Sequence, residues 1–92
     1  IEQSLQGKAK LVDIHIELLS RPDLKKLLEY VRSNNIQVLS IAYDPAYANT
    51  GLSVYSIALK INKNEQGKYI NHEVLLNSIK ALEYVNYVEY MD

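Results

Sequence analysis

The sequence contains no cysteine, no tryptophan and no phenylalanine, and only two prolines and three glycines among its 92 residues. The absence of cysteine excludes disulfide bonds and thiolate metal sites. Cysteine usage therefore gives no evidence of the cellular compartment. No apolar run approaches the roughly 18 residues of a membrane-spanning helix, and no signal peptide is present. Ten lysines and arginines stand against 11 acidic residues, and this balance provides no broad positive field for nucleic acids or anionic membranes.

The length of the chain suits one compact domain. With 48% hydrophobic and 23% charged residues, 92 residues have the composition of a single soluble core. Residues 1–10 show no sustained apolar period, so we interpret them as a linker or lead-in and residues 11–92 as the domain. The first residue is isoleucine and not methionine, which is typical of a piece of a longer or processed protein.

Hydrophobic periodicity predicts four strands and two helices in the order β-α-β-β-α-β. Alternation predicts strands at 11–18, 36–43, 52–61 and 84–90. A period near 3.6 predicts a helix that begins around Ser20 and ends at Asn34 and Asn35, and a second helix capped by Asn71. Right-handed connections then place both helices on one face of a four-stranded antiparallel sheet, with strands 11–18 and 52–61 in the centre. The predicted fold is an α+β, ferredoxin-like sandwich.

One face of the predicted sheet has no helix to cover it. If the apolar residues of strand 11–18 face the helices, Asp13, His15 and Glu17 lie on the open face. Strand 52–61 allows two phases, because either its even-numbered or its odd-numbered apolar residues can pack inside. Both phases leave apolar side chains outside, and eight tyrosines suit a partly wet interface. We therefore expect a homodimer that forms through the sheet.

Few residues form a pattern that indicates metal binding, ligand binding or catalysis. Asp13, His15 and Glu17 project from one strand face at spacings of about 7 Å, so they are candidate metal ligands if a neighbouring strand completes the shell. The alternative is an ordinary solvated row. Tyr55 alone can stack a base, and the acidic row would repel phosphate, so no nucleic-acid partner is predicted. No nucleophile, metalloprotease or phosphate-loop motif is present; we predict no enzymatic activity and no cofactor.

Two segments resemble the ACT domain, a small regulatory module. Ser20–Val31, SRPDLKKLLEYV, is similar to the loop and first helix of that family, and Leu82–Tyr90, LEYVNYVEY, is similar to its last strand. The resemblance runs from about Leu11 to Tyr90. It implies a site for an amino acid at the start of the first helix, where the family has a glycine. Asp23 stands in place of that glycine, and we interpret its carboxylate as satisfying the start of the helix.

Among ACT-like modules, the chain most resembles the C-terminal soluble domain of MgtC/SapB-type membrane proteins. This resemblance implies a non-catalytic cytoplasmic domain that is attached to a membrane-embedded part of the same polypeptide and linked to magnesium limitation. The alternative is a small-molecule sensor domain of a metabolic enzyme or regulator. In that case Ser20, Arg21 and Asp23, with Tyr43 or the 44–51 loop, would line an amino-acid site at the dimer seam.

Overall fold

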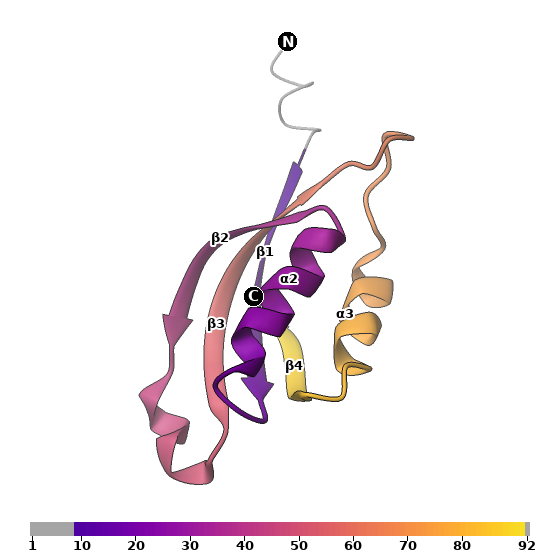
Figure 1. Ribbon diagram of the computed structural model, residues 1–92. Coiled ribbons are helices and arrows are strands. Elements are labelled where there is room, and N and C mark those ends of the chain that lie inside the picture. Colours follow the sequence, from indigo (N-terminus) through magenta and orange to yellow (C-terminus); the bar gives the residue numbers. More distant parts are fainter. Residues whose placement is uncertain (1–8, 92) are drawn as a thin grey trace.

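The computed structural model describes residues 9–91, which form four strands and two α-helices in the predicted order. The elements are β1 (Ala9–Leu18), α2 (Asp23–Ser33), β2 (Ile36–Tyr43), the 3₁₀ helix η1 (Pro45–Thr50), β3 (Ser53–Asn62), α3 (His72–Lys80) and β4 (Val85–Met91). The strands form one antiparallel sheet in the order β2-β3-β1-β4, so β1 and β3 are central. Figure 1 shows both helices on one side of this sheet. The predicted ferredoxin-like fold is confirmed.

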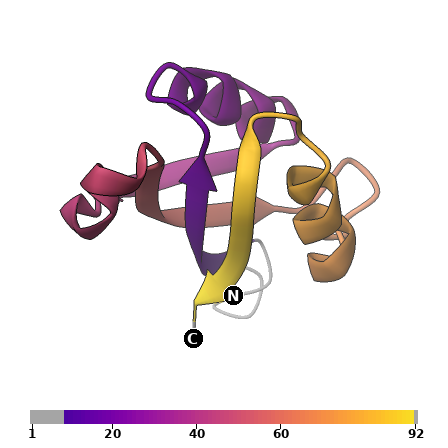
Figure 2. The same ribbon diagram turned by 90° about the horizontal axis from the view of Figure 1, so that it is seen from below.

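The ends of the elements differ from the prediction by one or two residues in most places. β1 begins at Ala9, so Ala9 and Lys10 belong to the sheet and not to the expected lead-in. Residues 1–8 of that lead-in lie outside the described part of the chain. The predicted turn at 44–51 contains η1, and Gly51 follows it with a φ of 85°, a left-handed conformation that suits glycine. η1 and α3 lie at opposite ends of the molecule (Figure 2).

Local chemistry explains where the helices begin and end. After α2, Asn35 adopts a φ of 65°, which agrees with the expected left-handed stop at the asparagine pair. Asn71 begins α3, because its side-chain oxygen accepts hydrogen bonds from the backbone N–H groups of Glu73 and Val74 at 2.8 and 3.2 Å. Within residues 9–91, neither helix combines the length and the apolar character needed to cross a membrane.

The hydrophobic core lies between the helices and one face of β1 and β3. Ile14 lies opposite Ile57, and Ile16 lies opposite Tyr55, so these side chains share the face that the helices cover. Leu59 and Ile61 continue this buried row along β3. The helices contribute four buried side chains to the same cluster, Leu27, Val31, Leu75 and Ile79.

The register decides the phase of β3, which the sequence left open. Because the odd-numbered residues of β3 pack inside, its other side presents Val54, Ser56, Ala58 and Lys60 beside the acidic row of β1. Val54 is itself buried. β3 therefore turns mainly small and polar side chains to the open face. Large exposed apolar side chains lie on both sides of the sheet: Leu11, Tyr87 and Met91 on the open face, and Ile41 and Tyr43 on the helix-bearing face of the edge strand β2.

Candidate functional site

The corner between β1 and α2 holds three of the four predicted ligand residues. Asp23 is buried, with 9% of its side chain exposed, and its Oδ2 accepts hydrogen bonds from the Ser20 backbone N–H at 3.0 Å and from the Ser20 hydroxyl at 2.8 Å. The Lys26 ammonium lies 3.6 Å from the other carboxylate oxygen. Asp23 thus accepts hydrogen bonds from the loop that precedes the helix. Ser20 holds Asp23 rather than capping a helix N–H with its side chain.

Tyr43 completes this corner from the end of β2. The Arg21 guanidinium lies 5.9 Å from the centre of the Tyr43 ring, and the Tyr43 ring lies 5.8 Å from that of Tyr55. A cation at this distance is attracted to the face of the ring. Within residues 9–91, Lys26–Asp23 is the one ion pair between a carboxylate and a lysine or arginine, so Arg21 has no carboxylate partner there. The structure therefore brings Ser20, Arg21, Asp23 and Tyr43 together; their role in binding stays a prediction.

The outer part of β2 is open beside this corner. Leu39, Ile41 and Tyr43 are 47%, 41% and 47% exposed. Ile41 and Tyr43 lie opposite the buried Ile57 and Tyr55, so they belong to the face that carries the helices. Figure 1 shows this end of β2 running clear of α2, which leaves these side chains uncovered.

The predicted metal row of β1 is part of a hydrogen-bonded polar cluster. His15 Nε2 lies 3.1 Å from Glu17 Oε2, and Asn86 of β4 donates to Glu17 Oε1 at 3.0 Å. The rings of Tyr47 and Tyr87 lie 5.9 and 6.2 Å from the His15 ring. Within residues 9–91, no three histidine, aspartate or glutamate side chains form a group that could hold a metal ion. Asp13, His15 and Glu17 therefore share a face without forming such a group, and metal binding there stays a prediction.

Tyrosines beside these clusters have altered acidity. The hydrogen bond from the Tyr87 hydroxyl to Glu89 Oε1, 2.8 Å long, raises the pKa of Tyr87. Burial raises the pKa of Tyr84, and the negative charge of Asp23 adds to this effect. Both hydroxyls therefore keep their protons at neutral pH, and that of Tyr87 donates to Glu89.

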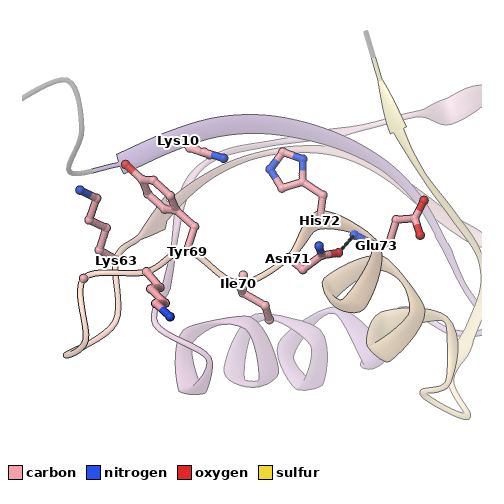
Figure 3. A pocket seen from close by; sticks show the side chains of 9 residues that line it. Lys10, Lys63, Tyr69, Ile70, Asn71, His72 and Glu73 are labelled. Atoms are coloured by element: carbon pink, nitrogen blue, oxygen red, sulfur yellow. Dashed lines mark hydrogen bonds between the residues drawn. The ribbon is translucent and has the colours of Figure 1, made fainter.

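A groove that the sequence did not predict lies beside the first turn of α3 (Figure 3). It has a volume of about 810 Å³, and its lining comes from the start of β1, the connection after β3 and the first turn of α3. Lys10, Lys63 and Lys68 line it together with Tyr69 and His72. The sequence signal was weak, because Lys10 fell in the expected lead-in and the other two lysines fell in a polar connection.

No protein-family model matches the chain, and no curated protein matches it. Among solved structures, the chain is similar to the ACT domain of a GTP pyrophosphokinase from Chlorobium tepidum, with a TM-score of 0.57 and 17% sequence identity. The match covers 90% of this chain and 99% of that domain. At this identity the likeness shows the fold alone. The chain therefore has the ferredoxin-like fold of an ACT domain.

Proposed function

We propose that this chain is a non-catalytic regulatory domain that pairs with a second copy of itself along β2. The observation that carries this proposal is the set of exposed apolar side chains on β2: Ile41 and Tyr43, which share one face, and Leu39, which lies at a register shift. β2 is the end strand of the sheet and pairs only with β3, so its outer side presents unpaired backbone groups. Such an edge is a template for strand pairing, and identical edges pair across a two-fold axis.

The dimer predicted through the open face stays a prediction, since that face also carries the exposed Leu11, Tyr87 and Met91. Sedimentation velocity at high micromolar concentration tests the edge. The unmodified chain should sediment as a dimer, and Ile41→Lys should be monomeric, because it places a charge among the apolar side chains of β2. Val74→Lys is the matched control, since Val74 is 57% exposed but lies on α3. A monomeric unmodified chain, or equal dissociation of both variants, would contradict the proposal.

A small-molecule sensor is the second candidate, and the corner at Arg21 favours it. Arg21 carries a guanidinium fork that has no carboxylate partner within residues 9–91, beside the half-exposed ring of Tyr43. A guanidinium binds a carboxylate through two parallel hydrogen bonds. Because the Asp23 carboxylate occupies the start of α2, an amino-acid ligand would direct its carboxylate to Arg21. These are the residues predicted to line an amino-acid site at the dimer seam.

A thermal-shift screen with free amino acids and divalent ions separates the two candidates. A sensor should melt several degrees higher at saturating ligand, because the ligand binds only the folded state. Arg21→Gln should remove the shift, and Arg32→Gln at the end of α2 should keep it. If no amino acid or ion changes the melting temperature, the sensor hypothesis is wrong and the proposal of an interaction domain remains. A shift that survives in Arg21→Gln would place the ligand elsewhere.

The wider context is proposed from the sequence resemblance alone. A domain of the MgtC/SapB type would be cytoplasmic, would be joined to a membrane-embedded part of the same polypeptide, and would act when magnesium is limiting. The reading frame upstream of Ile1 tests this context. Several hydrophobic spans there would support it, and a metabolic enzyme in their place would support the sensor.

A further inference from the structure

The groove at the start of α3 concentrates positive charge in a chain whose net charge is -1. Three of the ten basic residues line it, Lys10, Lys63 and Lys68. Glu73 is the one carboxylate among its nine lining residues. The ion pairs within residues 9–91 include none of these three lysines. The groove therefore carries a local positive charge that the described protein does not neutralise.

Two of the lysines are close to the same aromatic ring. The Lys10 Nζ atom lies 4.7 Å and the Lys63 Nζ atom 5.6 Å from the centre of the Tyr69 ring. Figure 3 shows this ring between the two side chains, with His72 on the far side of Lys10. The ring attracts both ammonium groups and so keeps like charges near each other. A bound anion would relieve the repulsion between them.

Hydrogen bonds order the connection after β3 and so fix the backbone positions of Lys63 and Lys68. The Asn64 side-chain oxygen accepts hydrogen bonds from the backbone N–H groups of Gln66 and Lys68, each 2.9 Å long. The Asn64 N–H donates to the Lys68 carbonyl at 2.8 Å. Gly67 permits this tight turn with a φ of 77°. Lys63 and Lys68 are thus held at the two ends of one turn, on the border of the groove.

These features select a class of ligand. Ammonium groups are compact point charges that suit the tetrahedral oxygens of phosphate, whereas planar carboxylates favour the guanidinium fork, which is absent from the lining. The volume of about 810 Å³ is within the range of small-molecule sites. The balanced charge of the whole chain argues against a nucleic acid. We propose that the Lys10–Lys63–Lys68 groove binds a soluble small molecule that carries a diphosphate or polyphosphate group.

Isothermal titration of the 92-residue chain with inorganic pyrophosphate tests this site. The titration is done near 0.15 M salt, where weak surface attraction is largely screened. The double variant Lys63→Ala/Lys68→Ala should bind at least about tenfold more weakly, which is the effect of losing one charge-assisted hydrogen bond. The matched control Lys25→Ala/Lys80→Ala changes the net charge equally on the two helices and should bind within about twofold of the unmodified chain.

Two further measurements locate the site and distinguish a soluble phosphate ligand from a lipid headgroup. In ¹⁵N-resolved NMR spectra, pyrophosphate should shift the amide signals of residues 63–73 and leave those of β2 unchanged. Ile41→Lys should bind pyrophosphate as tightly as the unmodified chain, because one chain forms the whole groove. A chain that proves to be monomeric would therefore leave this proposal intact. No binding of pyrophosphate, equal weakening in both double variants, or binding only to phosphatidylglycerol vesicles would overturn it.

Discussion

The hydroxyl of Tyr90 joins β4 to the beginning of α3. It donates a hydrogen bond to the His72 carbonyl at 2.6 Å, and burial raises the pKa of Tyr90 above its ordinary value of 10.0. Above that pH, the folded state keeps a proton that the unfolded chain has lost. Proton linkage then makes the free energy of unfolding fall as the pH rises.

We expect Tyr90→Phe to respond to pH in a characteristic way. At neutral pH it should lose about 0.5–1.5 kcal/mol of stability with the hydrogen bond. Between about pH 8 and about pH 11, the free energy of unfolding should fall less for this variant than for the unmodified chain, because the group whose pKa rises on folding is gone. Urea unfolding at both pH values measures this. A Tyr90→Phe slope equal to that of the unmodified chain would contradict the explanation.

At the scale of single elements, the start of α2 depends on Asp23. Removal of its carboxylate in Asp23→Ala leaves the Ser20 N–H and hydroxyl without their acceptor. We expect a loss of about 1–3 kcal/mol in the free energy of unfolding. The ion pair with Lys26 contributes little of this, since that lysine is exposed. Glu29→Ala, on the exposed side of the same helix, should change stability by less than about 0.5 kcal/mol. Equal effects of the two variants in urea unfolding would show that Asp23 has no such role.

The helices and strands were largely predictable because each carries its own local signal. Period-two alternation identified β1, and the cap at Asn71 identified the start of α3. The phase of β3 was not decided, because both of its sides carry apolar residues. The larger area of Tyr55, Ile57, Leu59 and Ile61 was the available signal, since burial of more apolar surface stabilises the fold more.

At the scale of the whole molecule, the clusters that depend on distant segments were not predictable. Glu17 and Asn86 are 69 residues apart in the chain, and their contact requires the register between β1 and β4. The basic groove likewise joins Lys10 to a turn more than one strand and one helix away. The corner of Ser20, Arg21, Asp23 and Tyr43 was predictable through the family resemblance, which named the loop that forms it.

The side chains and backbone groups exposed on the open face and at the β2 edge determine where the molecule can associate. Its open face carries the His15–Glu17 cluster, with a hydrogen bond from Asn86 of β4, and the exposed side chains of Leu11, Tyr87 and Met91. Its β2 edge carries exposed apolar side chains and unpaired backbone groups. Completion of backbone hydrogen bonds favours association at the edge, and burial of the apolar side chains there adds to it.

Backbone hydrogen exchange, followed while the protein concentration is raised, tests this account most directly. Pairing of two copies should slow the exchange of the outward amides of Ile36–Tyr43 as dimers form, because these amides gain partners. The amides of β1, which already have partners on both sides along most of the strand, should not change. Exchange in β2 that is independent of concentration, together with slowing elsewhere in the sheet or helices, would contradict association through the edge.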